Sequence, residues 1–125
     1  MSELHKFLFD GLPVRGIIVR LTDAWTEVLQ RRQLNTGTGP WAPEVAELMG
    51  QMAAAGALMQ SNIKFNGALV LQIFGDGPVK VAVAEVQPDL SLRATAKVVG
   101  DVPAGARLPQ MVNVGNQGRC AITLD

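Results

Sequence analysis

Two alternating runs of apolar residues flank a short glycine-rich segment, and this pattern constrains the fold more than any other in the chain. Residues 69–74 read LVLQIF, and apolar side chains recur at every second position again from Val79 to Val83. A period of two is the signal of a β-strand. Residues 75–78 read GDGP, and glycine, aspartate and proline favour tight turns. The sequence therefore predicts a β-hairpin.

The other periodic segments extend this hairpin to an α+β fold, with a largely antiparallel β-sheet packed with two main helices. Further strands are expected at residues 14–21, 91–99 and 119–124, whereas residues 4–12 are expected to form a helical or irregular lead-in. The strand at 14–21 carries apolar side chains on both faces, which indicates a central rather than an edge position.

Two longer segments carry helix signals. Thr22 or Asp23 is a candidate N-cap for a helix that ends near residue 34. Pro43 is suited to the first turn of a second helix, which extends to about residue 61. The glycine-rich residues 35–41 connect the two helices as a loop.

The second helix contains Gly50 and Gly56. Glycine inside a helix costs roughly 1 kcal/mol relative to alanine, so we expect another backbone to approach closely at these two positions. Pro109 is expected to open one further short helical turn through Val112.

Composition limits the class of protein. The chain has 125 residues, enough for one domain, and 48% of them are apolar, which argues against disorder. Its 11 basic residues balance 11 acidic ones and are scattered, so no nucleic-acid footprint is visible. No segment offers about 18 uninterrupted apolar residues, and the N-terminus lacks a secretory pattern. We expect a cytoplasmic protein without nucleic-acid or membrane partners.

The chain has one cysteine and one histidine. Cys120 cannot form an internal disulfide, and with only His5 as a companion it cannot complete a four-ligand zinc site. Because Cys120 lies in an apolar strand pattern, we expect a buried, inert thiol rather than a redox-reactive one. His5 is expected to be a surface or capping residue rather than an acid–base catalyst.

The two glycine-rich segments at 75–78 and 114–118 each allow a structural or a ligand-binding interpretation. A phosphate-binding loop places its glycines at a helix N-terminus, whereas residues 75–78 lead into a strand, which favours a turn. The chain contains no recognisable nucleophile motif and no pair of carboxylates suited to catalysis. The sequence therefore predicts a protein that is not an enzyme.

Five apolar residues are candidates for an adaptable binding face. Met49, Met52 and Met59 fall on one stripe of the second helix, and Phe7 and Phe9 lie near the N-terminus. Methionine is flexible and polarizable, which suits a surface that binds different partners. The alternative for all five is ordinary core packing.

Three sequence blocks, in order, carry a family resemblance. The first is Leu4 to Phe9 followed by Val14 to Gly16, and the second is Lys64 to Gly67 with Gln72 and residues 75–78. The third is Val114 to Asn116 followed by Ala121 to Thr123. Together they resemble the 33 kDa chaperonin family (heat shock protein 33), the redox-regulated holdases. Asn66 departs from the family, which has aspartate at this point.

The resemblance implies that residues 1–125 are the N-terminal portion of a chaperone core domain. It implies an ATP-independent holdase that binds unfolded client proteins and prevents their aggregation under oxidative or heat stress. In the family, the redox switch is a zinc-binding cluster of four cysteines in a C-terminal domain. We expect that domain to be absent here, so no cofactor is expected in this chain.

Two other functions remain open from the sequence. One is a small α+β interaction or assembly module without chaperone activity, and the other is an enzyme that holds a small ligand at its two glycine turns. We also expect a homodimer or other self-association, because the strand at 119–124 would present an unpaired edge.

Overall fold

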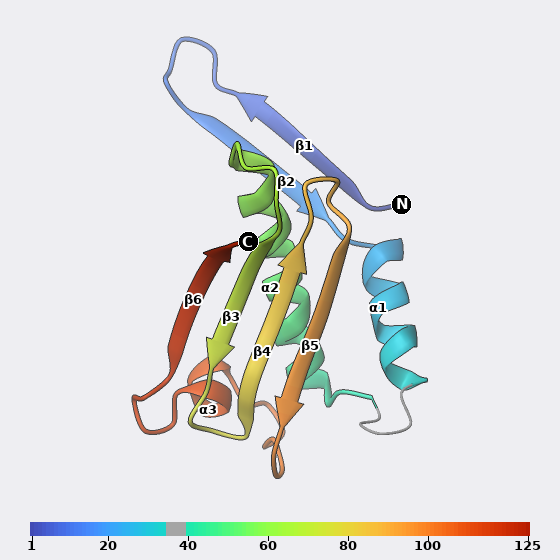
Figure 1. The fold of residues 1–125 in the computed structure, drawn as a ribbon, viewed down its shortest axis with the longest axis vertical. Helices are drawn as coiled ribbons and strands as arrows, with labels where there is room; N and C mark the ends of the chain where they lie inside the picture. The colour runs from blue at the N-terminus through green and yellow to red at the C-terminus, as the bar shows by residue number, and fades with distance from the viewer. Residues whose placement is uncertain (35–39) are drawn as a thin grey trace.

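The computed structural model describes residues 1–34 and 40–125, and most of the loop expected at 35–41 lies outside these residues. The described part confirms an α+β fold with antiparallel sheets (Figure 1). In chain order its elements are β1 (Glu3–Leu8), β2 (Arg15–Arg20), α1 (Asp23–Gln33), α2 (Pro43–Asn62), β3 (Leu69–Phe74), β4 (Val79–Val86), β5 (Leu92–Val98), α3 (Leu108–Val112) and β6 (Arg119–Leu124).

The predicted hairpin is the centre of the larger sheet. Strands β3 and β4 pair antiparallel, and the full order is β5-β4-β3-β6. Helix α2 covers one face of this sheet and contacts β3, β4 and β5 (Figure 1). Alternate residues of the hairpin point toward α2 and form the core with the apolar face of the helix. Its largest fully buried side chains are Val45, Met49, Leu69, Val79 and Val86.

The two glycines of α2 mark close contacts, as the sequence predicts. A Cβ atom on Gly56 would lie 2.9 Å from Cγ2 of Val86 in β4, and one on Gly50 would lie 3.2 Å from the ring of Trp25 in α1. The approaching groups are side chains and not the backbone that we expected. The helix can therefore sit against the sheet and α1 only because these positions lack a side chain.

The prediction for residues 4–12 is wrong, because residues 3–8 form strand β1. This strand pairs antiparallel with β2 in a separate two-stranded sheet, so the predicted central position of β2 is also wrong. Apolar residues on both faces of β2 do not reflect burial on both faces, since Ile18 is 59% exposed. Residues 3–8 show no clear alternation of apolar and polar side chains, so their extended conformation depends on pairing with β2.

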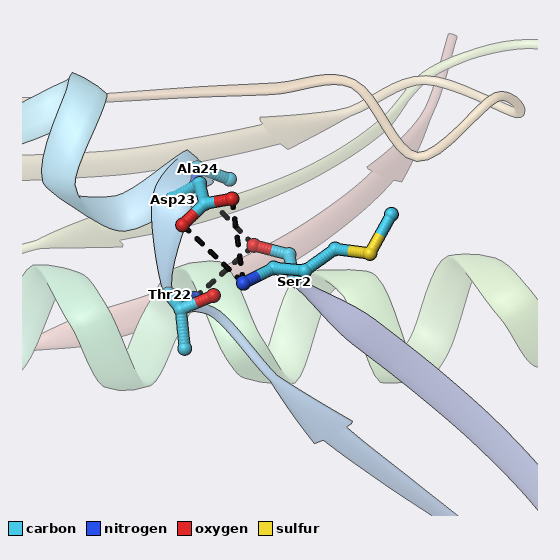
Figure 2. A network of polar contacts seen from close by, with 5 residues as sticks. Ser2, Thr22, Asp23 and Ala24 are labelled. Atoms are coloured by element: carbon cyan, nitrogen blue, oxygen red, sulfur yellow. Dashed lines mark hydrogen bonds and ion pairs between the residues drawn. The ribbon is translucent and has the colours of Figure 1, made fainter.

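Helix α1 has the predicted span but a different cap. Thr22 occupies the N-cap position, yet its side chain makes no capping hydrogen bond. Instead, Ser2 Oγ accepts hydrogen bonds from the backbone N–H groups of Thr22 and Ala24, at 3.1 and 3.2 Å (Figure 2). The terminal amino group donates to Asp23 Oδ1 at 3.3 Å. Ser2 and the terminal amino group thus hold the N-terminus of α1 in place.

The expectation of a buried Cys120 is wrong, because this residue is exposed. Cys120 lies opposite Ile73 in the register of β6 with β3, so both side chains point to the face that α2 covers. The contacts of α2 reach β3, β4 and β5. At β6 the same face stays open, and Ile122 and Leu124 are exposed beside Cys120.

Candidate functional site

The N-terminal hairpin, formed by β1, β2 and the loop between them, projects from the body of the molecule (Figure 1). We call residues 3–20 the apolar arm. Its large hydrophobic side chains remain accessible to solvent, and Phe7 and Phe9 are 40% and 49% exposed. The exposed apolar residues of the arm are Phe7, Leu8, Phe9, Leu12, Val14 and Ile18.

The two aromatic rings of the arm are held in place by local structure. Phe7 lies opposite Gly16 in the strand register, and a Cβ on Gly16 would overlap the Phe7 ring. The Phe7 and Phe9 rings stack with their centroids 5.9 Å apart. A backbone hydrogen bond from Phe9 to Val14 O, at 3.0 Å, closes the base of the loop. The arm therefore presents a preformed aromatic surface to solvent.

The arm is attached to the body through β2 and α2. These two elements contact each other, and Lys6 Nζ donates a hydrogen bond of 2.6 Å to the carbonyl oxygen of Ser61 near the end of α2. The outer half of the apolar arm and the loop between β1 and β2 extend beyond this attachment (Figure 1). This position leaves the aromatic rings accessible to a large partner.

The predicted methionine stripe divides between the core and its margin. Met49 is completely buried and Met52 is 4% exposed, whereas Met59 is partly buried and packs against the core. Of the five candidate binding residues, only Phe7 and Phe9 lie on the open surface. A role for them in binding clients stays a prediction.

The two glycine-rich segments meet at Asp76. Asp76 Oδ2 accepts hydrogen bonds from the backbone N–H groups of Gly115 and Gln117, at 2.8 and 3.0 Å. These donors, Gln117 foremost, lower the pKa of the Asp76 carboxyl group. A Cβ on Gly77 would lie 2.5 Å from the carbonyl oxygen of Met111. The glycines thus allow the β3–β4 turn to pack against α3 and the following loop.

The two titratable side chains that we considered for chemistry, His5 and Cys120, are both exposed. His5 is exposed as expected, and its nearest carboxylate is Glu3 Oε2, at 3.5 Å. Within residues 1–34 and 40–125 there is no group of three or more histidine, cysteine, aspartate or glutamate residues that would hold a metal ion. No helix in that part of the chain is both long and apolar enough to cross a membrane.

Comparison with known proteins matches almost the whole chain. The family model described as Hsp33 protein matches residues 2–125. The 33 kDa chaperonin of Chromobacterium violaceum is 42% identical over 124 residues, and that of Methylobacillus flagellatus is 40% identical over 126 residues. Both alignments cover 99% of this chain but only 39% of the relative. The 33 kDa chaperonin of Aliivibrio fischeri is 33% identical over 114 residues, which are 91% of this chain and 37% of the relative.

Proposed function

The chain belongs to the Hsp33 protein family, and from that premise we propose that it is an ATP-independent holdase that binds unfolded proteins through the apolar arm. The observation that carries this proposal is the set of exposed apolar side chains on the arm, with Phe7 and Phe9 at its centre. Apolar patches on a soluble protein mark sites of interaction. A protein that binds the unfolded state of a client withdraws that state from aggregation.

The proposal concerns this chain, which spans 39% of the length of the relatives named first. Redox regulation in the family depends on a zinc-binding cluster of four cysteines. The residues here do not fit that cluster, because the sequence has a single cysteine and a single histidine. We therefore propose that this chain binds no zinc and acts without oxidant. Elemental analysis that finds stoichiometric zinc in the purified protein would contradict the first part.

Suppression of aggregation tests the proposal directly. A chemically unfolded client is diluted into buffer without oxidant or nucleotide, with and without the chain, and aggregation is followed by light scattering. The double variant Phe7→Ser, Phe9→Ser should lose suppression, because it removes the aromatic surface of the arm. The matched control is Phe74→Ser, which removes an aromatic ring of similar exposure, 45%, from β3 in the body.

The comparison between the two variants decides the outcome. Circular dichroism first confirms that both variants are folded. Equal suppression by wild type and the arm variant would exclude the arm as the binding surface. A chain that suppresses nothing would instead favour the interaction or assembly module without chaperone activity.

We also propose that the chain self-associates through the edge of β6. The larger sheet ends at β6, and Ile122 and Leu124 are exposed along this strand. An exposed apolar edge strand is a template for pairing with another chain. The cytoplasmic location stays a prediction from the N-terminal sequence.

A further inference from the structure

Strand β5 forms the other edge of the larger sheet, and helix α1 stands beside it (Figure 1). A groove of about 510 Å³ lies between the two elements. On the α1 side it is lined by Ala24, Glu27, Val28 and Arg31, which share one helical face, and by Arg32. On the other side it is lined by residues 90–95. None of the residues that line this groove belongs to the apolar arm, so the groove requires a separate explanation.

The backbone of β5 directs unused hydrogen-bonding groups into this groove. The backbone N–H group of Gln87 donates to the carbonyl oxygen of Ser91 at 2.9 Å, and this bond shows which residues of the β4–β5 ladder are hydrogen-bonded to each other. In an antiparallel pair, alternate residues bond to the partner strand and the residues between them point away. Arg93 and Thr95 therefore bond to β4, while Leu92, Ala94 and Ala96 direct their N–H and C=O groups outward.

Arg32 confirms this pattern and closes one end of the groove. Its Nη2 atom donates to the carbonyl oxygen of Ala96 at 3.4 Å, so that carbonyl does point toward α1. The guanidinium lies 5.0 Å from the centre of the Trp41 ring. Within residues 1–34 and 40–125 no hydrogen bond engages the outward groups of Leu92 and Ala94, and these groups offer the donors and acceptors that an added strand needs.

Charge at the groove favours an acidic occupant. Three arginines and one glutamate line it, namely Arg31, Arg32, Arg93 and Glu27. Glu27 pairs with Arg31 at 2.6 Å, and Glu85 on β4 pairs with Arg93. The guanidinium of Arg32 forms no ion pair with a carboxylate in the described residues, so the groove carries a net positive charge.

We propose that the α1–β5 groove binds an extended acidic peptide segment, which adds to the sheet as a strand beside β5. Its backbone pairs with Leu92 and Ala94, at the usual strand spacing of about 4.8 Å. Alternate side chains of an added strand point to opposite faces. Acidic side chains on one face then lie beside Arg93, where they compete with Glu85 for its guanidinium, and apolar side chains on the other face lie beside Leu92 and Val28.

A labelled seven-residue peptide of alternating valine and glutamate is the probe, and fluorescence anisotropy reports its binding to the chain. The same peptide with lysine in place of glutamate should bind at least about tenfold more weakly, because it repels the arginines. N-methylation of the peptide amides that face β5 should abolish binding, whereas N-methylation of the alternate amides should not. These peptide changes leave the protein unaltered.

The matching protein variant is Ala94→Pro. Proline removes the outward N–H of residue 94 and leaves the bonds to β4 intact, a position at which edge strands tolerate it. We expect at least about a tenfold loss of affinity. The matched control is Ile122→Pro, which removes an outward N–H from the opposite edge at β6 and should leave peptide binding unchanged. Far-UV circular dichroism confirms that both variants are folded.

Each alternative has a distinct signature. Strand addition would be overturned if the peptide N-methylated at the amides that face β5 bound as tightly as the unmodified peptide, or if wild type and Ala94→Pro bound the unmodified peptide with equal affinity. Full displacement of the peptide by inorganic phosphate, with Ala94→Pro unaffected, would replace the proposal with a simple anion site. If Ala94→Pro instead converts a dimeric chain to a monomer in light scattering, the groove binds a second copy and the proposal is wrong.

Discussion

The cap of α1 by Ser2 allows the sharpest test of how this fold is held together. Ser2 Oγ is the acceptor for two backbone N–H groups at the helix N-terminus, those of Thr22 and Ala24 (Figure 2). Ser2→Ala removes this acceptor and leaves both partly buried donors without it. Loss of a single N-cap typically costs about 1 kcal/mol, within a range of about 0.5–2. Because two donors share this oxygen, we expect a loss of about 1–2 kcal/mol in the free energy of unfolding.

Urea unfolding followed by far-UV circular dichroism measures this loss. At a urea dependence of about 2 kcal/mol per molar, the middle of the usual range for a small domain, the midpoint should fall by roughly 0.5–1 M. The slope itself should not change, because the substitution alters a local contact and not the surface exposed on unfolding.

Thr22→Val is the matched control. Thr22 holds the N-cap position, but its Oγ1 atom is buried and has no hydrogen-bond partner in the described residues. Replacing this hydroxyl with a methyl group of similar size should leave stability unchanged or raise it slightly. If Thr22→Val is as destabilising as Ser2→Ala, then Thr22 caps the helix in solution, and the argument for a remote cap is refuted.

Three further predictions concern packing, charge and the sheet edge. Gly56→Ala should lower the free energy of unfolding by about 1–3 kcal/mol, because the added Cβ would crowd Val86. Urea unfolding of this variant, with and without Val86→Ala, measures the coupling between the two sites. The hydrogen bonds that Asp76 accepts lower the pKa of its carboxyl group. The Asp76 carboxylate therefore stabilises the fold above about pH 4, and this contribution is lost as the pH falls further. The stability gap between wild type and Asp76→Asn in urea should therefore narrow between about pH 6 and pH 3, and a constant gap would contradict the assignment. Ile122→Pro should convert a self-associating chain to a monomer in light scattering, and a wild type that is monomeric at every concentration would refute association through β6.

Elements with strong local signals could be predicted from the sequence. The hairpin of β3 and β4 follows from its alternation and its turn residues, and α2 begins at Pro43 as expected. The failures lie where a partner outside the segment decides the outcome. Strand β1 exists because it pairs with β2, and α1 is capped by Ser2, which precedes Thr22 by 20 residues. Neither relation leaves a pattern within a short window of sequence.

The connection through Asp76 was missed for a similar reason. Both glycine-rich segments were recognisable as turns, but their contact involves residues 39 and 41 positions apart. One signal was present in the sequence, an aspartate between two glycines, since aspartate often accepts hydrogen bonds from backbone N–H groups in turns. Which N–H groups it would meet depends on where α3 and the following loop fold back onto the sheet.

The division between core and binding surface shows most clearly what sequence patterns leave undecided. Met49 and Phe7 were both candidates, because each is a large apolar residue that could serve either core packing or a binding face. Helix α2 lies on the sheet, so Met49 is buried, whereas Phe7 lies on an arm and is 40% exposed. The proposed holdase activity requires a surface that is accessible to clients and that does not pack into the protein's own core. The stacking of Phe7 on Phe9 and its packing over Gly16 meet both conditions, since they fix the rings on a two-stranded sheet outside the main core. Gly16→Val should therefore displace the Phe7 ring and weaken suppression of client aggregation while leaving the buried core unchanged, and undiminished suppression would show that the position of this ring is immaterial.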